Sequence, residues 1–328
     1  MVRALVTGAT GCVGANIVEA LLARGYEVRA LRRESSTLDA LTGLTPEMVM
    51  GDVLDSDSLR AAMTGCQFVF HAAAISQYWR NKPDLIYTVN VIGTRNVLEA
   101  ARICGVDRVV FTSSVATLGV PTRSGQLINE EAWYNWPPDR FHYGHSKLLA
   151  EGEVGRAVAR GLDVVTVNPT TVIGRRDVNH VGGEILRVVK KGWFLLAPPG
   201  GMGVVSAQAT GIGHVLAAER GRRGERYILS GENISHRRMM EIVASVVGGT
   251  PPLATIPRTL MRGAVALAWQ GLKFAGVDAP SFLAQMDLST RDMYFDGSKA
   301  TRELGMPYVD AATAIREAWS WYRQQGEL

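Results

Sequence analysis

Three glycines near the start of the chain constrain its fold more than any other feature. Gly8, Gly11 and Gly14 follow a short apolar run at residues 4–7 and open a segment, 13–23, whose apolar residues recur at helical spacing. Glycines in this setting let the backbone turn sharply and approach a pyrophosphate, which then lies on the N–H groups of the helix N-terminus. The loop residues that we expect to contact a dinucleotide are Gly8, Thr10, Gly11, Cys12, Val13 and Gly14.

The first half of the chain alternates apolar strands with helices. We expect further strands at 28–31, 47–50, 68–72, 108–112 and 163–168, and helices at 58–63, 85–104 and 142–160. Strands that are apolar throughout are typical of a parallel sheet covered on both faces. Right-handed crossovers then give an α/β fold, a Rossmann-type doubly wound parallel sheet.

This alternation breaks after Pro169. Glycine and proline cluster at 197–203, which predicts a loop, and helices at 237–247, 259–274 and 311–324 dominate the remainder. We therefore expect a dinucleotide-binding domain at 1–168 and a smaller, mainly helical substrate-binding region at 169–328, with 204–230 returning to the sheet.

Charge and cysteine content exclude several classes of protein. The net charge of +4 comes from scattered or paired basic residues, which favours a small anionic ligand over nucleic acid. Three cysteines without a CxxC motif argue against disulfides and against a metal site, and indicate a reducing, cytoplasmic setting. No signal-peptide pattern is present, and no apolar run reaches the roughly 18 residues of a membrane-spanning helix.

The end of the second strand indicates which dinucleotide binds. An acidic residue there bonds the ribose 2′-hydroxyl of NAD(H), whereas an arginine accommodates the 2′-phosphate of NADP(H). Arg32 and Arg33 follow the strand at 28–31, so NADP(H) is favoured over NAD(H). Two alternatives remain open: the pair is a solvated surface charge, or Glu34 reaches a ribose.

Candidate catalytic residues follow later strands. Tyr143 and Lys147 lie four residues apart in a predicted helix, and therefore on one face. A nearby ammonium lowers the pKa of a phenol, which can then exchange a proton with a carbonyl or hydroxyl. Ser114 ends the preceding strand and could stabilise charge on a substrate oxygen, although Ser113 is the alternative.

Together these motifs resemble the extended short-chain dehydrogenases/reductases of the NAD-dependent epimerase/dehydratase family. The matching segments, in the family's order, are 7–14 (TGATGCVG), 51–53 (GDV), 71–74 (HAAA), 89–96 (VNVIGTRN), 111–114 (FTSS), 143–147 (YGHSK), 168–174 (NPTTVIG) and 295–305 (FDGSKATRELG). Segments 168–174, 228–233 and 256–258 resemble the dihydroflavonol-reductase-like branch, which includes hopanoid-associated sugar epimerases.

The resemblance implies roles for individual residues. Tyr143 would be the acid/base, Lys147 would bond the nicotinamide ribose, and Ser114 would bind the substrate oxygen. Asn90 would support the active site, unless it is an ordinary helix residue. The remaining cofactor contacts implied are Asp52 and Val53 at the adenine, Ala72, Ala73 and Ala74 along the dinucleotide, and Pro169 and Val172 at the nicotinamide. The resemblance also implies a homodimer built on helices 85–104 and 142–160.

The substrate is less constrained. Segments 77–79, 133–136 and 193–196 and Met202 carry aromatic and apolar residues that we expect to line the substrate pocket. The alternative is that their tryptophans pack in the core or at a dimer surface. Such a lining suits a small molecule with a bulky, apolar body, so we expect an NADPH-dependent reductase of a ketone or aldehyde.

Two alternatives to a reductase are kept. One is an NDP-sugar epimerase with a bound nicotinamide cofactor, in which Arg175, Arg176 and Arg187 hold the diphosphate. The other is a non-catalytic NADP(H)-binding sensor, which would not need Ser114, Tyr143 and Lys147. For the unusually apolar segment 253–282, packing in the core or as a lid is favoured over a peripheral contact with a membrane surface.

Overall fold

The computed structural model describes residues 2–123, 125–193, 195–276 and 281–327. Its centre is a seven-stranded, fully parallel sheet in the order β10-β6-β5-β4-β1-β2-β3. The strands are β1 (Arg3–Thr7), β2 (Glu27–Arg32), β3 (Glu47–Met50), β4 (Phe68–His71), β5 (Arg108–Thr112), β6 (Val164–Pro169) and β10 (Arg226–Leu229). The order reverses direction between β1 and β4, which is where doubly wound sheets bind ligands. The predicted fold class is confirmed.

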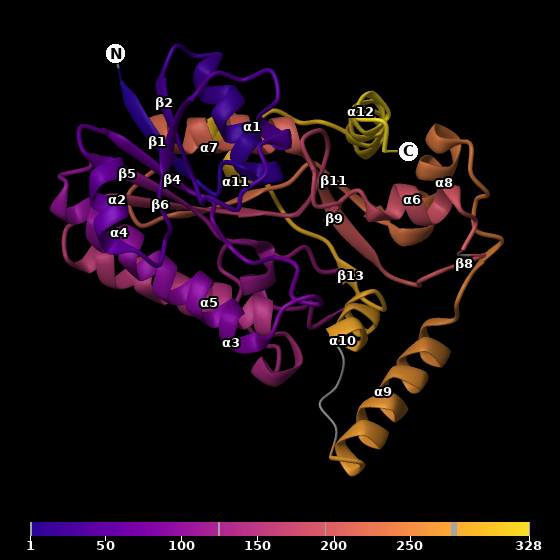
Figure 1. Ribbon diagram of the computed structural model, residues 1–328. Helices are drawn as coiled ribbons and strands as arrows, with labels where there is room; N and C mark the ends of the chain where they lie inside the picture. The colour runs from indigo at the N-terminus through magenta and orange to yellow at the C-terminus, as the bar shows by residue number, and fades with distance from the viewer. Residues whose placement is uncertain (1, 124, 194, 277–280, 328) are drawn as a thin grey trace.

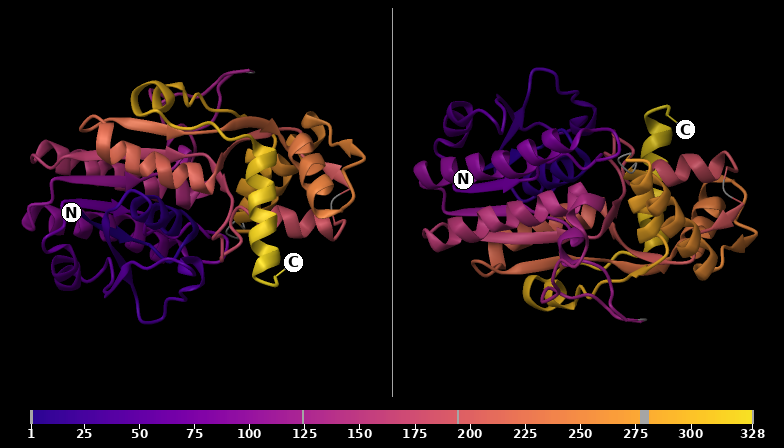
Figure 2. Two further views of the ribbon diagram at one scale, coloured as in Figure 1. Left: turned by 90° about the horizontal axis from the view of Figure 1, so that it is seen from above. Right: turned by 90° about the horizontal axis from the view of Figure 1, so that it is seen from below.

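Helices cover both faces of this sheet (Figure 1). One face carries α1 (Cys12–Leu22), α7 (Ala207–Arg220) and α11 (Ser298–Leu304), and the other carries α2 (Ser56–Met63), α4 (Gly93–Ile103) and α5 (His142–Ala159). The two layers are seen in turn in Figure 2, where α1 and α7 lie side by side over one face and α4 and α5 over the other.

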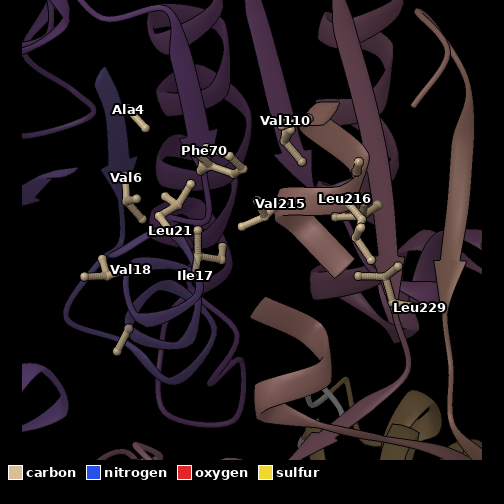
Figure 3. Packing of buried hydrophobic residues seen from close by; sticks show 14 of the residues in the cluster. Ala4, Val6, Ile17, Val18, Leu21, Phe70, Val110, Val215, Leu216 and Leu229 are labelled. Atoms are coloured by element: carbon tan, nitrogen blue, oxygen red, sulfur yellow. The ribbon is translucent and has the colours of Figure 1, made fainter. Parts of the chain in front are cut away.

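Buried aliphatic residues hold the layers together. Ile17 and Leu21 of α1 and Val215 of α7 meet Val6 and Phe70 of the sheet, and all five side chains are fully buried (Figure 3). A second cluster fills the opposite face of the sheet. Because strand residues alternate between the two faces, strands that are apolar at every position are the expected sequence signature of this arrangement.

The predicted helix at 85–104 is interrupted in the structure. It consists of α3 (Pro83–Tyr87), a π-helical turn over Thr88–Ile92, and α4. The extra residue of a π turn rotates everything that follows, and such turns are frequent at functional sites. Asn90 lies within this turn and is buried.

A smaller body packs beyond the carboxyl ends of the strands. Its sheet has the order β11-β9-β13, with β7 also paired to β9, and its core is built on α6, α8 and α12. Its elements are β7 (Thr171–Ile173), α6 (Glu184–Lys190), β8 (Leu196–Ala197), β9 (Gly201–Ser206), β11 (Glu232–Ser235), α8 (His236–Val247), β12 (Ala254–Thr255), α9 (Arg258–Phe274), α10 (Ser281–Leu288), β13 (Asp292–Met293) and α12 (Ala311–Gln324). Within 204–230, α7 and β10 lie on the large sheet, whereas β9 belongs to the small one. In the described part of the chain, no helix combines the length and apolarity needed to cross a membrane.

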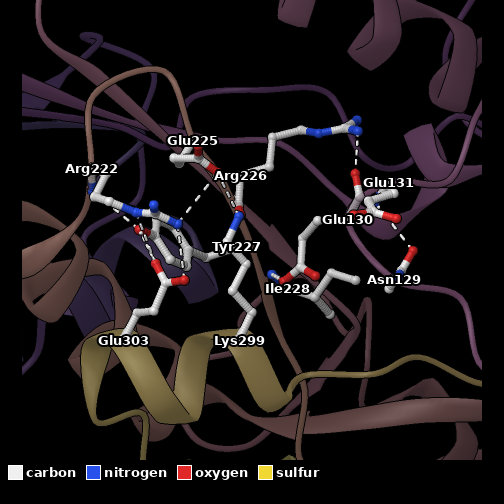
Figure 4. A network of polar contacts seen from close by, with 10 residues as sticks. All are labelled: Asn129, Glu130, Glu131, Arg222, Glu225, Arg226, Tyr227, Ile228, Lys299 and Glu303. Atoms are coloured by element: carbon white, nitrogen blue, oxygen red, sulfur yellow. Dashed lines mark hydrogen bonds and ion pairs between the residues drawn. The ribbon is translucent and has the colours of Figure 1, made fainter.

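Polar contacts fix β10 at the edge of the large sheet (Figure 4). Arg222 and the hydroxyl of Tyr227 both bond Glu303 of α11, and the Lys299 ammonium lies 2.7 Å from Glu225 Oε2. On the other side, the Ile228 N–H donates to Glu130 Oε1 at 2.9 Å. Distant segments around residues 130 and 300 are thereby tied to the edge strand.

Candidate active site

A cleft of about 980 Å³ lies between the carboxyl ends of the large sheet and the smaller body. The predicted site residues that line it are Gly8, Thr10, Gly11, Cys12, Val13, Gly14, Arg32, Arg33, Asp52, Val53, Ala72, Ala73, Ala74, Ser114, Tyr143, Lys147, Pro169 and Val172. The cleft thus brings together every predicted site residue except Asn90, which is buried behind its wall.

The glycine loop is shaped by close backbone contacts. Gly8 has φ +68°, and a Cβ there would lie 2.6 Å from the backbone nitrogen of Ala73. A Cβ on Gly14 would lie 2.1 Å from the carbonyl oxygen of Gly8. Only glycine allows β1, the loop and the end of β4 to approach this closely.

The N-terminus of α1 opens into the same cleft. Gly11 caps the helix with no side-chain hydrogen bond, and the first turn carries no acidic residue. The first N–H groups of a helix have no partner within it and carry partial positive charge. The cradle left by Gly8, Gly11 and Gly14 therefore fits the diphosphate of a dinucleotide.

Arg32, the last residue of β2, and Arg33, which follows it, line the cleft at this end of the strand. Arg32 is half-buried and Arg33 is exposed, and both line the cleft, whereas Glu34 is not among its lining residues. Asp52 lines the cleft nearby, and its Oδ1 accepts a hydrogen bond from the Leu54 N–H at 2.9 Å. This end of the cleft offers two guanidinium groups to an anionic substituent.

Tyr143 and Lys147 both lie near the start of α5 in the cleft wall, where Lys147 is buried and Tyr143 is half-buried. The ring of Tyr143 stacks on that of Tyr78, with centroids 5.9 Å apart and planes 17° apart. Burial raises the pKa of Tyr143, while a hydrogen bond with the Ser114 side chain lowers it. This direction is opposite to the one we expected from Lys147, since removal of the phenol from water dominates.

The Lys147 ammonium is held by the sheet. Its Nζ donates to the Thr112 carbonyl oxygen at 2.6 Å and lies 4.7 Å from the centre of the Phe111 ring. Burial lowers the pKa of Lys147 to about 8, and the charge of Glu151 opposes this shift. Lys147 is therefore a fixed cation at neutral pH, but one that loses its proton more readily than an exposed lysine.

The two candidate serines differ in their partners. The Ser113 hydroxyl is 2.5 Å from Glu151 Oε1, so it is engaged inside the protein. The Ser114 hydroxyl accepts the Ala116 N–H at 3.2 Å, and the Ser114 side chain lowers the pKa of the Tyr143 phenol. Of the two, Ser114 is the one beside the candidate acid.

Asn90 joins two parts of the site wall. Its Oδ1 accepts the Ile75 N–H at 2.8 Å, and its Nδ2 donates to the Ser146 hydroxyl at 2.9 Å. Ser146 lies between Tyr143 and Lys147 on α5. Asn90 therefore links the segment that follows β4 to the catalytic turn of α5.

Glu151 was not anticipated from the sequence. Its Oε1 accepts hydrogen bonds from Ser113, from the Thr117 hydroxyl at 2.9 Å and from Asn168 Nδ2 at 2.9 Å. It lies four residues after Lys147, so it continues the same helix face, and that spacing was the signal available. Glu151 anchors the turn that carries Ser114.

The substrate end of the cleft is built from both bodies. Tyr78, Trp79, Trp136 and Met202 line it, as the aromatic segments suggested. Trp133 and Trp193 are exposed and do not line it, and Phe194 lies outside the described residues. Lining residues that sequence reasoning missed include Phe141, Gln285, Leu288, Ser289, Met293 and Phe295.

The arginines considered as diphosphate ligands have other partners. Arg175 Nη2 lies 2.9 Å from Glu19 Oε1, and Arg176 pairs with Glu19 and donates to the Ala40 carbonyl oxygen at 2.8 Å. Arg187 bonds His180 at 3.1 Å. None of the three arginines lines the cleft.

Comparisons with known proteins agree with this geometry. Residues 4–196 match the NAD dependent epimerase/dehydratase family. The chain is 38% identical to a putative dihydroflavonol 4-reductase of Synechocystis sp., over 98% of this chain and 94% of that protein. It is 35% identical to sterol demethylase protein B of Methylococcus capsulatus, over 99% of each. The crystal structure of gox2253 superimposes with a TM-score of 0.89 at 32% identity, over 99% of both chains.

Proposed function

We propose that this chain, which belongs to the NAD dependent epimerase/dehydratase family, catalyses a reaction of the kind found in that family. Within that family of oxidoreductases, epimerases and dehydratases, we infer a reductase or dehydrogenase. We assign it the NADPH-dependent reduction of a ketone or aldehyde in a bulky, largely apolar small molecule. The names of two relatives, a dihydroflavonol reductase and a sterol demethylase protein, support a substrate of this kind.

One observation carries this choice over a sugar-nucleotide reaction. Among the described residues that line the cleft, the arginines and lysines are Arg32, Arg33 and Lys147. The first two lie at the end of β2 and the third beside Tyr143, so the substrate end has no such cation. The cleft lining also contains a histidine, His236. Burial lowers the pKa of this histidine to about 4, so its imidazole is neutral at pH 7. A substrate diphosphate would lose its hydration there and find no counter-charge, which is energetically costly. An apolar substrate body has no such cost.

We assign the dinucleotide to the glycine loop and the end of the sheet. The α1 N-terminus holds the diphosphate, Arg32 and Arg33 hold a 2′-phosphate, Asp52 and Val53 contact the adenine, and Lys147 bonds the nicotinamide ribose. Such a cofactor supplies a hydride to the carbonyl carbon. We further assign 1–168 to cofactor binding and 169–328 to the substrate region.

The remaining roles belong to side chains of the chain itself. Ser114 donates a hydrogen bond to the carbonyl oxygen and stabilises the negative charge that develops on it. Tyr143 delivers the proton to that oxygen. Burial raises the pKa of Tyr143, so the phenol carries its proton at working pH, while the hydrogen bond with Ser114 acts against this rise and keeps the phenol a stronger acid. Glu151 and Asn90 position Ser114 and Tyr143 through hydrogen bonds.

A screen of cofactor oxidation tests the proposal. NADPH consumption should be measured with aromatic and alicyclic ketones, aldehydes and UDP- or dTDP-sugars. Turnover of an apolar carbonyl compound with equimolar loss of NADPH is expected. Inversion of a sugar-nucleotide centre without net NADPH loss would establish the epimerase instead. Cofactor binding with no turnover of any class would favour the sensor.

A further inference from the structure

Helix α9 runs outward from the body of the molecule, as Figure 1 shows at its lower right. It spans Arg258–Phe274, yet only Met261 and Val265 of its residues are buried. A helix of 17 residues is about 25 Å long. An extended surface of this kind is therefore open to an outside partner.

The open side of α9 carries an apolar stripe. Leu260 is 65% exposed, Leu267 is 72% exposed and Phe274 is 96% exposed. These residues are seven apart, two helical turns each, so they project along one line. The residues between them on that line are Gly263, Ala264 and Gly271, which are also exposed. Large apolar side chains gathered on one free face mark an interaction surface.

The charges around this stripe are of one sign. Residues 242–277 contain no aspartate or glutamate, and their cations are Arg258, Arg262 and Lys273. Arg258 is neutralised by Asp292 at 2.8 Å. Arg262 and Lys273 take part in none of the ion pairs among the described residues, and both lie on one side of the helix, about 120–140° around its axis from the stripe. Arg262 Nε also donates to the Thr290 hydroxyl at 3.3 Å. The exposed face is therefore apolar, with cations along one side.

Exposed apolar residues with a nearby cation are also found at the start of the helix. Strand β12, which directly precedes α9, pairs with β8, and Leu195, Leu196 and Leu253 are exposed there. Lys191 and Trp193 follow α6 beside them, with the ammonium 4.6 Å from the centre of the indole. Tryptophan and lysine are side chains that favour the interface between water and lipid headgroups.

We propose that α9 docks this protein onto an anionic lipid bilayer. Leu260, Leu267 and Phe274 enter the boundary between headgroups and acyl chains, while Arg262 and Lys273 contact the phosphates. A second copy of α9 fits less well, because each helix has a net positive charge and neither offers an acidic residue to the cations of the other. Anionic lipid supplies both the apolar and the charged complement.

The docking helix also leads to the cleft. Helix α10 packs against α9, and its Leu288 and the following Ser289 line the substrate end. A molecule dissolved in the bilayer would reach this end along α9. The docking itself does not depend on the proposed reaction, and its test uses no substrate.

Vesicle flotation of the whole protein tests the proposal. The vesicles are equimolar phosphatidylglycerol and phosphatidylcholine, compared with phosphatidylcholine alone. The unmodified protein should float with the anionic vesicles, less so at high salt. The triple variant Leu260→Gln, Leu267→Gln and Phe274→Gln should bind them about tenfold or more weakly. The double variant Arg262→Gln and Lys273→Gln should lose binding to anionic vesicles by a similar factor.

A matched control replaces exposed leucines elsewhere. Leu38→Gln with Leu127→Gln should bind vesicles like the unmodified protein. Because all the replaced side chains of the triple variant are exposed, circular dichroism should show it folded. Failure of the unmodified protein to float would overturn the proposal, as would equal flotation of the triple variant. If the unmodified protein does not bind vesicles but forms an assembly that the triple variant does not form, the apolar face binds a second copy of the chain.

Discussion

The Lys147 ammonium lies 2.6 Å from the carbonyl oxygen of Thr112, the last residue of β5. This contact ties the catalytic turn of α5 to the strand that leads into Ser114. The lysine is therefore positioned by the sheet and is not free to follow Tyr143. With Glu151 bonded to Ser113, α5 and the end of β5 form one rigid unit.

The pH profile of kcat/KM should report Lys147. Burial lowers its pKa from 10.5 to about 8, so the cation is lost as the pH rises through about 8, and kcat/KM should fall there. Glu151 raises this pKa. Glu151→Gln should therefore move the alkaline limb to lower pH, besides lowering kcat by loosening Ser114.

The control for this profile is Glu153→Gln on the same helix, whose carboxylate pairs with Arg95 and Arg156. It should leave the alkaline limb in place. An alkaline limb unmoved by Glu151→Gln would contradict the electrostatic link between Glu151 and Lys147.

Cofactor preference should depend on Arg32 and Arg33. Removing both guanidinium groups with Arg32→Ala and Arg33→Ala should weaken NADPH binding about 100-fold, or roughly 2.7 kcal/mol, and change NADH binding little. Isothermal titration calorimetry with both cofactors measures this. Arg24→Ala, which removes an arginine that pairs with Glu219 outside the cleft, is the control. Tighter binding of NADH than of NADPH by the unmodified protein would refute the assignment.

The chain should form a dimer through α4 and α5. Sedimentation at micromolar concentration is expected to give about twice the 35.5 kDa chain mass. Leu149 of α5 is 41% exposed, and Leu149→Glu should produce monomers because it would bury a charge in the interface. Leu127→Glu, on a loop, should leave the dimer intact. A single chain-mass species for the unmodified protein would count against this arrangement.

Local patterns predicted much of the large sheet, because its inner strands β1, β4, β5 and β6 are buried on both faces and are therefore apolar at nearly every position. The π turn over Thr88–Ile92 was not predicted, since one added residue barely changes the periodicity of a continuous helix. The glycine loop was predictable because backbone sterics decide the residue type there. A Cβ on Gly14, for example, would lie 2.1 Å from the Gly8 carbonyl oxygen.

Long-range pairings explain what the sequence left open. Arg175 and Arg176 were considered as anion ligands, yet Glu19, some 156 residues earlier, pairs with both. Glu151 reads as a helix-surface charge until Ser113 and Asn168 are placed against it. The direction of the Tyr143 pKa shift depends on burial, which neighbouring residues in the sequence do not reveal.

Single-turnover kinetics of Tyr143→Phe test the central claim most directly. With an apolar carbonyl substrate from the screen and prebound NADPH, hydride transfer should be at least about 100-fold slower than in the unmodified protein, because the proton donor is gone. NADPH affinity should be unchanged, and Tyr134→Phe, whose ring lies beside His145 rather than in the cleft, should react normally. Near-normal hydride transfer in Tyr143→Phe would contradict the account.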